Sequence, residues 1–474
     1  MATLKHGVYV EQRATAVNTP FAAASGVPFV IGAAPVQSAE KPVGVGVPML
    51  VSNWEDAVKL LGYSEDWESY PLCEFMYSHF RLFACEPVVF CNVLDPGTMK
   101  ETVEGKDLAV TDHKVVLPLE AINDAALVVK QQGGQEAAYV RGTDYETYYS
   151  DQGLVVELLE DGSHYAETQL NIAYDQVKAS QVTSTVIATG LEKVDLCATS
   201  LKVVPDLLCA PGHSHDPAVA AIMAEKAAGI GGLFRAKALI DQDTTKVKTL
   251  AQSITAKETD LTNAVEQDVC WPLLRYEGRT YHQSTQLAGV MAQTDTKNDG
   301  TPCESPSNKR YMCDAAVLAD GTEITLTLDE ANKLNANGIV TALKFLGEWT
   351  CWGNYNACWP ENTDVKDYFI PVSRMFGWVG NSVTKTIWTR VDNPMNRPLI
   401  DAVMNDITIW LNGLTGSGYL LGGRIEFLDE ENPTENLIAG IMKFHIYLTP
   451  PSPAQEIDFI LEYDASYVAS ALQG

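Results

Sequence analysis

The sequence has no apolar run that could cross a membrane. A transmembrane helix needs about 18 or more consecutive apolar residues, and no stretch of this chain approaches that length. The first segment, Met1 to Arg13, also lacks a basic stretch followed by the apolar run of a secretory signal. These absences predict a soluble, unsecreted protein that is made in the cytoplasm and does not insert into a membrane.

The ten cysteines form neither a metal-binding pattern nor a redox pair. No two of them are in Cys-x-x-Cys spacing. Cys351 and Cys358 are among the closest pairs in the sequence, and neither has a histidine at the sequence spacing of a metal site. The glycine-rich stretches 229–232 and 413–423 lack the residues of a phosphate-binding or dinucleotide-binding loop. We therefore expect buried, reduced thiols and no metal or other cofactor.

Basic residues are scarce. The chain has 33 Lys and Arg against 61 Asp and Glu, which gives a formal net charge of -28. Proteins that bind nucleic acid or anionic lipid need basic surfaces. The charge balance therefore argues against nucleic acid and membrane surfaces as partners.

The length of 474 residues predicts several domains, about two to four by the usual size of a single core. Residues 27–32 are a continuous apolar run typical of a strand buried on both faces. A helical pattern follows at 54–61, and 85–93 has strand composition. We expect an N-terminal arm over residues 1–20 and the first part of an α/β core over 21–95.

Composition changes after Asp95. Short β-branched runs separated by turn residues follow, at 115–119, 126–130, 144–149, 154–159 and 170–174. Regularly spaced short strands are typical of a β-sandwich or barrel. We expect an inserted β-sandwich domain over residues 96–190.

Strands and helices alternate again from Leu191. A buried strand and turn at 206–212 precede a helix at 217–228 and a strand at 236–241. Such alternation predicts a parallel sheet. We expect a second α/β domain over residues 191–345.

The last segment, residues 346–474, is expected to be an α+β C-terminal domain. Arg397-Pro398 begins a helix with apolar residues on one face. The glycine-rich stretch 413–423 is predicted to be a loop. Strands are predicted after it, at 424–428, 438–448 and 455–463.

The sharpest indication of an enzyme is Gly212-His213-Ser214-His215-Asp216 after a predicted strand. A hydrolase nucleophile elbow needs Gly-x-Ser-x-Gly, and Asp216 stands where the last glycine should be. Two histidines could also bind a metal, but no nearby carboxylate or cysteine cluster completes a site. We expect a capped, exposed loop, with an α/β hydrolase using Ser214 as the alternative.

Aromatic residues are dense between Trp349 and Trp359. Such rings can stack on sugars, so a carbohydrate-binding module is another alternative. The preferred interpretation is that the rings fill a core or a subunit interface.

Several segments resemble, in order, the contractile-tail sheath family of myophages and related injection particles, over nearly the whole chain. Residues 7–11 resemble the family's N-terminal arm, and 208–214 with 236–241 look like its subtilisin-like α/β module, a name given for topology. Residues 305–308, 334–339 and 349–359 add to the resemblance. Residues 354–357 depart from the family's Trp-Gly-x-Arg-Thr run, so no specific arginine contact is assigned.

The resemblance implies a structural protein and not an enzyme. It implies a sheath of stacked hexameric rings around an inner tube, made in the host cytoplasm, whose contraction drives the tube through a cell envelope. The implied partners are other copies of the chain, the tube protein, and baseplate and tail terminator proteins. A hydrolase and a carbohydrate-binding baseplate or fibre module remain the alternatives.

Each end of the chain has a strand-like segment with no obvious partner nearby. Unpaired strands can be completed at the sheet edge of another molecule, and residues 15–20 would then act as a hinge. The predicted inter-subunit strands comprise Gly7, Val8, Tyr9 and Val10 at one end and Ile457, Phe459, Leu461 and Tyr463 at the other.

A local excess of basic residues between positions 370 and 397 is unusual in so acidic a chain. Only Asp392 opposes them in that interval. We expect this surface to face an acidic tube through Arg374, Lys385, Arg390 and Arg397.

Overall fold

The computed structural model describes residues 22–472. Its centre is an eight-stranded sheet in the order β18-β17-β12-β11-β10-β1-β3-β2. Six strands run parallel, and β2 and β18 join antiparallel at the two edges. The parallel sheet predicted from alternating strands and helices is confirmed. The strands are β1 (Pro28–Gly32), β2 (Met49–Val51), β3 (Val88–Asn92), β10 (Leu207–Cys209), β11 (Lys237–Asp241), β12 (Gln267–Cys270), β17 (Ile339–Phe345) and β18 (Glu348–Trp352).

Helices cover both faces of this sheet because successive side chains of its strands point in opposite directions. In β1, Phe29 and Ile31 join one apolar cluster and Val30 joins the other. One cluster includes side chains of α3 (Ser184–Leu191), α4 (Pro217–Ala228) and α7 (Leu328–Asn335), with α5 (Leu250–Asp260) packed against it. The other cluster includes side chains of α1 (Trp54–Leu61), α2 (Pro71–Met76) and α6 (Gln283–Lys297).

Local capping explains where the predicted helices begin. Asn53 accepts a hydrogen bond from the backbone N–H of Asp56 at the start of α1, and Asp216 accepts one from Ala218 at the start of α4. Proline stands in the first turn of α4, where its missing donor is harmless. The predictions at 54–61 and 217–228 are confirmed.

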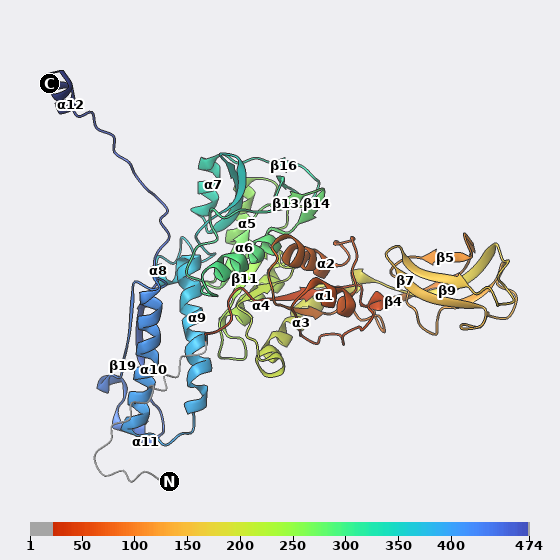
Figure 1. The fold of residues 1–474 in the computed structure, drawn as a ribbon, viewed down its shortest axis with the longest axis horizontal. Helices are drawn as coiled ribbons and strands as arrows, with labels where there is room; N and C mark the ends of the chain where they lie inside the picture. The colour runs from red at the N-terminus through yellow and green to blue at the C-terminus, as the bar shows by residue number, and fades with distance from the viewer. Residues whose placement is uncertain (1–21, 473–474) are drawn as a thin grey trace, which may run out of the picture.

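Residues 100–177 form two antiparallel three-stranded sheets that project from the core, away from the long C-terminal helices (Figure 1). They enclose an apolar cluster that includes Val115, Leu154 and Ile172. The predicted strands lie in these sheets, and the sequence did not predict β4. The first sheet holds β4 (Lys100–Ala109), β9 (Gln169–Val177) and β6 (Val128–Gln131); the second holds β5 (Lys114–Leu117), β8 (Gly153–Leu158) and β7 (Tyr145–Ser150).

A four-stranded antiparallel sheet lies next to the core. Its strands, in the order β14-β13-β15-β16, are β13 (Leu273–Tyr276), β14 (Arg279–Tyr281), β15 (Ala315–Val317) and β16 (Glu323–Ile324). Within residues 22–472 no helix is both long and apolar enough to span a bilayer. All cysteines except Cys303 and Cys313 are buried, and all are free thiols.

The C-terminal part is built on two long helices, α9 (Ile370–Ile387) and α10 (Arg397–Gly416), which lie side by side (Figure 1). The same part of the chain contains the short helices α8 (Val365–Tyr368), α11 (Thr434–Ile438) and α12 (Ser466–Leu472). Strands β19 (Gly422–Glu426) and β20 (His445–Thr449) form a two-stranded antiparallel sheet.

Two predictions in this part need correction. The predicted loop at 413–423 is shorter, at 417–421, because α10 continues to Gly416 and β19 begins at Gly422. The strand predicted from 438 begins only at His445, because the Asn432 side chain bonds to Leu428 and Lys443 and holds the preceding residues as a loop. The strand predicted at 455–463 forms no ladder within residues 22–472, and its pairing with a neighbouring copy stays a prediction.

Candidate assembly site

The C-terminal segment leaves the body of the molecule as an extended arm, here residues 450–465, with α12 at its tip (Figure 1). Its large apolar side chains face solvent: Ile457 is 69% exposed, Phe459 85%, Leu461 95% and Tyr463 83%. Ile460, on the alternate side, is exposed as well. Contiguous apolar surface of this kind marks an interaction site in soluble proteins.

The root of the arm is held against the body. Pro450, Pro451 and Pro453 restrict its backbone, and the Gln455 side chain donates a hydrogen bond of 3.0 Å to the Tyr355 hydroxyl. The root forms one wall of a groove of about 1070 Å³. Parts of residues 305–308, 334–339 and 349–359, the segments that carried the family resemblance, line the other walls.

The aromatic segment 349–359 is mostly part of the interior. Trp349 is buried, and its indole N–H donates to the Asp314 carbonyl. The indole N–H of Trp352 donates to the Asn332 side chain, and that of Trp359 donates to the Ala336 carbonyl. Because all three indole donors are used inside the chain, they are not available to a sugar. This arrangement favours the core interpretation.

The β19–β20 sheet has only two strands, and neither outer edge is paired within residues 22–472. One face packs on α10, where Gly423 lies so close to Leu411 that a Cβ would stand 3.2 Å from its Cδ2. On the sheet, the Arg424 guanidinium lies 3.8 Å from the centre of the Tyr447 ring. Two-stranded sheets are marginally stable alone, so additional strands would stabilise this one.

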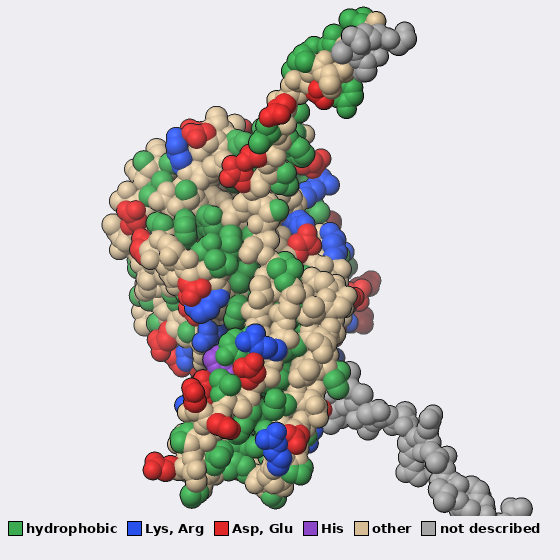
Figure 2. All heavy atoms as spheres, turned by 90° about the vertical axis from the view of Figure 1, so that its left-hand side faces the viewer, with side chains coloured by type: hydrophobic (Ala, Val, Ile, Leu, Met, Phe, Trp, Pro, Cys, Tyr) green, Lys and Arg blue, Asp and Glu red, His purple; other side chains and the backbone are tan. Residues whose placement is uncertain are grey.

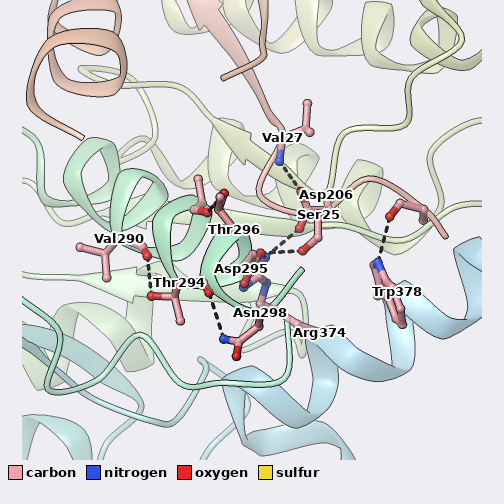
Figure 3. A network of polar contacts seen from close by, with 12 residues as sticks. Ser25, Val27, Asp206, Val290, Thr294, Asp295, Thr296, Asn298, Arg374 and Trp378 are labelled. Carbon is pink, nitrogen blue, oxygen red and sulfur yellow. Dashed lines mark hydrogen bonds and ion pairs between the residues drawn. The ribbon is translucent and has the colours of Figure 1, made fainter. Parts of the chain in front are cut away.

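The N-terminal strand predicted at Gly7–Val10 lies outside the described residues. The segment that follows, from Ala23 to Val27, is fixed at several points (Figure 3). The Ala23 N–H donates to the Ser382 hydroxyl at 2.8 Å, and its carbonyl accepts from the Trp378 indole at 2.9 Å. Ser25 donates to Asp295, and the Val27 N–H donates to Asp206.

Arg374 does not belong to an exposed basic surface, which corrects the prediction that it faces a tube. Its guanidinium is buried and donates to Asp295 at 3.0 and 2.5 Å and to Asp206 at 2.8 Å (Figure 3). Burial raises the pKa of Asp295, and the charge of Arg374 opposes that shift. The cluster joins α9 to the end of α6 and to the start of β10.

The other three predicted basic residues lie along α9 and at the start of α10. Lys385 is half-buried near the end of α9. Arg390 forms an ion pair with Asp406, and Arg397 forms one with Asp401, each at 2.9 Å. These two acids follow position 397 and therefore lie outside the interval 370–397 that has the excess of basic residues. Figure 2 shows basic and acidic side chains interspersed on one face of the molecule.

Ser214 is fully buried, so the predicted exposed loop is wrong at this position. Its hydroxyl donates to the Asp241 carboxylate at 3.1 Å and accepts from the Asp241 backbone N–H at 3.0 Å. Within residues 22–472 no histidine is hydrogen-bonded to Ser214, so a general base is missing from the arrangement. The same part of the chain holds no cluster of three metal-ligating side chains.

His282 and Glu74 form an ion pair near this loop. The Nδ1 atom of His282 lies 2.7 Å from a Glu74 oxygen, and its backbone N–H donates to the other oxygen. Burial lowers the pKa of His282, but the Glu74 carboxylate outweighs that effect and raises it to about 9. Burial lowers the pKa of neighbouring His213 to about 4. The pair therefore serves to hold α2 to the start of α6.

The known proteins that are similar in sequence to this chain are described as tail sheath proteins. No protein-family model matches the chain. It is 25% identical over 413 residues to the tail sheath protein of Burkholderia phage BcepMu, covering 82% of this chain and 83% of that protein. It is 22% identical over 397 residues to a putative prophage major tail sheath protein of Pseudomonas aeruginosa strain UCBPP-PA14, covering 82% and 94%.

Solved structures show the same fold. The sheath complex of the extracellular contractile injection system PVC, in the contracted state, matches with a TM-score of 0.58 and 16% identity over 98% of this chain and 99% of that one. The contracted baseplate of the anti-feeding prophage matches with a TM-score of 0.57 and 13% identity, over 98% and 100%. The chain is therefore similar over most of its length to tail sheath proteins, and it is a structural sheath subunit of a phage tail or phage-tail-like contractile particle.

Proposed function

We propose that copies of this subunit are linked by exchange of terminal strands. The C-terminal arm, through Ile457 to Tyr463, adds to a sheet edge of one neighbouring copy, and Gly7 to Val10 does the same at another. The observation that carries this proposal is the row of exposed apolar side chains on an arm that forms no ladder with any part of residues 22–472.

The β19–β20 sheet is the acceptor that fits best. Neither of its edges is paired within the described residues, and one of its faces packs on α10. A ladder of about five hydrogen bonds at ~1 kcal/mol each, together with burial of the apolar side chains, would hold an arm through a large movement of the subunits. Backbone pairing also tolerates rotation of whole subunits better than a rigid side-chain interface.

The polymer is proposed to consist of stacked hexameric rings around an inner tube, with baseplate and terminator proteins at its ends. Two solved structures with the same fold support this assembly. One is described as a sheath complex in the contracted state, and the other as a baseplate in the contracted state. Contraction needs no nucleotide if the extended lattice is kinetically trapped and the short lattice buries more surface. At about 25 cal/mol per Å², a few hundred additional Å² of apolar burial per subunit would supply several kcal/mol.

The proposed domain layout has an arm at 1–20, an α/β core beginning at 21–95, an inserted β-sandwich at 96–190, a subtilisin-like module at 191–345 and a polymerisation domain at 346–474. Support comes from the separate apolar cluster of the inserted sheets and from the cluster formed between α9 and α10. Parallel β10, β11 and β12 support the α/β topology of the module.

The arm is tested with the double variant Phe459→Asp and Leu461→Asp. These side chains are almost fully exposed in the single chain, so unfolding of the monomer should be unchanged, whereas sheath formation should be lost. Asp458→Asn with Glu462→Gln, at alternate positions of the arm, is the control and should still polymerise. Electron microscopy and sedimentation report the outcome.

Sheaths of normal length from Phe459→Asp/Leu461→Asp would refute the role of the C-terminal arm. Deletion of residues 1–14 tests the N-terminal arm separately, and unimpaired long sheaths would refute that half of the proposal.

Lys385, Arg390 and Arg397 are proposed to face the tube. Support comes from their position along α9 and at the start of α10 and from their charge in an acidic chain. Lys385→Glu should weaken docking to the tube but leave tube-free polymerisation intact. The matched control is Lys106→Glu in the projecting sheets, an exposed residue with the same charge change. Equal docking by both variants would reject the assignment.

A further inference from the structure

The two strands of the β19–β20 sheet are covered unequally on the face that packs toward the helices. Strand β19 rests on α10, and its inward side chain Ile425 is only 6% exposed. Ile446, which lies opposite Ile425 on β20, and Leu448 pack toward the same apolar cluster but are only half-buried. The apolar layer is therefore incomplete beneath β20.

A cavity of about 500 Å³ lies where this layer is incomplete. Its walls combine the half-buried ring of Phe376, from α9, with residues 422–424 of β19 and 446–449 of β20. Cavities of this size can enclose a drug-sized ligand, so large side chains fit as well. Because β19 rests on α10 and β20 shares the cavity with α9, a strand added at the outer edge of β20 would lie over the cavity.

The C-terminal arm has two faces of different chemistry. Successive residues of a strand point to opposite faces, so the exposed apolar row within residues 457–463 lies on one face. Asp458 and Glu462 lie on the other face, with Ile460 between them. An arm that adds to the β19–β20 sheet with its apolar row toward the helices must present the two acids on the outer face of the sheet.

That outer face carries a cation. The Arg424 guanidinium lies over the ring of Tyr447, its cross-strand neighbour on β20, and its Nε atom bonds to Glu426 at 2.8 Å. The charge of Arg424 is therefore displaced from its own strand toward β20. Its side chain is still 62% exposed, so it remains accessible to a carboxylate on a strand beside β20.

We propose that the outer edge of β20, together with the cavity, receives the C-terminal arm of a neighbouring copy. Phe459 enters the cavity and packs against Phe376, while Asp458 and Glu462 lie beside Arg424 on the opposite face. This inference rests on the proposed function and specifies the edge and the side chains that perform it. The partner is a strand that is apolar on one face and acidic on the other.

The arm that occupies this edge comes from a second copy. Strand β20 ends at Thr449 and is followed directly by Pro450 and Pro451. The tight turns of a β-hairpin need positive φ at their central residues, and proline cannot adopt it. In agreement, the arm leaves the body of its own chain (Figure 1) and forms no ladder with its own β20.

The first test is the variant Phe376→benzoylphenylalanine in the full-length chain, which places a photoreactive ring in the cavity. Sheaths are assembled from a mixture of unlabelled and ¹⁵N-labelled subunits and irradiated, and the cross-linked peptides are identified by mass spectrometry. We expect cross-links from position 376 to residues 457–463, including pairs of one labelled and one unlabelled peptide. Val391→benzoylphenylalanine, at an exposed position beyond the other end of α9, is the control and should not reach the arm.

Cross-links from position 376 that stay within one chain, or that reach a neighbour but miss its arm, would overturn the assignment. An equal yield of arm cross-links from position 391 would overturn it as well.

The second test reverses charges and leaves the cavity unchanged, so it applies even if the photoreactive variant does not assemble. Arg424→Glu places a negative charge beside the two acids of the arm, and Asp458→Lys with Glu462→Lys creates the same repulsion from the arm. Each change should raise the critical concentration for assembly about fivefold, the scale of one exposed ion pair. Neutral amides at 458 and 462 remove only the attraction, so that variant still polymerises.

All three charge reversals in one chain should return the critical concentration to nearly the native value, because opposite charges face each other again. Arg310→Glu is the matched control: Arg310 also forms an exposed ion pair, with Glu348, and is 64% exposed, but it lies outside the β19–β20 sheet. It should leave assembly unchanged. A combined variant that assembles no better than either half, or an Arg310→Glu variant as weak as Arg424→Glu, would contradict the proposed pairing.

The outcome is separable from that of the proposed function. If Phe459→Asp/Leu461→Asp still blocks assembly but the cross-links and the charge reversals fail, the arm acts at another edge and only the present assignment is wrong. If the Phe459→Asp/Leu461→Asp variant assembles normally, the underlying strand exchange fails first.

Discussion

Arg374 is the residue on which the junction between the core and α9 depends most directly. Arg374→Met would leave Asp206 and Asp295 without their buried counter-charge, and unpaired buried charges are strongly destabilising. We expect a loss of about 3–5 kcal/mol in the free energy of unfolding, measured in urea. Lys385→Met, in which a half-buried surface charge on the same helix is lost, should change it by less than about 0.5 kcal/mol. A similar small change for both would contradict the assigned role of the cluster.

His282 gives the stability a pH dependence of known sign. Its pKa is about 9 in the folded chain, above the ordinary histidine value of 6.5, so the folded state binds the proton more tightly than the unfolded chain does. The stabilisation is therefore complete below about pH 6.5 and is lost as the pH rises through about 9, by about 3 kcal/mol in total. His282→Gln should lose most of this dependence. The difference between the unfolding free energies of the two proteins, taken from pH 6 to 9.5, isolates the effect; a constant difference would disprove it.

At the scale of elements, the proline-rich root sets the direction of the C-terminal arm. Replacing Pro450, Pro451 and Pro453 with serine adds conformations to the unbound arm, at about 0.4–1 kcal/mol for each proline. We expect the critical concentration for sheath assembly to rise about tenfold, with the monomer equally stable. Pelleting of sheaths across a dilution series measures this concentration. An unchanged value would mean that the root does not orient the arm.

Elements were predictable where their signals are local. Helices α1 and α4 begin at Asn53 and Asp216, whose caps are visible within four residues of sequence. Strand β4 was missed because it is rich in charged residues and is defined by pairing with β9, about 70 residues later. The arm was predicted to be apolar and extended, as the structure has it, but a ladder needs a second strand, and no strand within residues 22–472 pairs with the arm.

The assembly site was predictable only in part, for the same reason. Arg374 has a basic neighbourhood in the sequence, yet its partners Asp295 and Asp206 are 79 and 168 residues away. Likewise, the acids that pair with Arg390 and Arg397 are found only when α10 folds beside α9. The groove at the arm root brings together three segments that the sequence presents separately.

At the scale of the whole molecule, the projecting sheets are a separable unit. Lys100 at the start of β4 pairs with Val177 at the end of β9, so the two connections to the core lie side by side. Replacing residues 100–177 with a short Gly-Ser linker should leave the core folded and sheaths able to form. Thermal unfolding and electron microscopy check this. Failure of the shortened chain to fold, with a full-length control intact, would contradict the proposed layout.

One feature of the C-terminal part bears on the length of the polymer. Strand β20 ends at Thr449 and the arm begins at the next residue, so the proposed acceptor and the proposed donor are consecutive pieces of one chain. A head-to-tail contact of this type does not close on itself unless rotation brings the first copy back to the last. At each end of the particle, the last ring of subunits would then have either unpaired β19–β20 sheet edges or unpaired C-terminal arms. Growth would then have no internal stop, and a different protein would have to set the finished length.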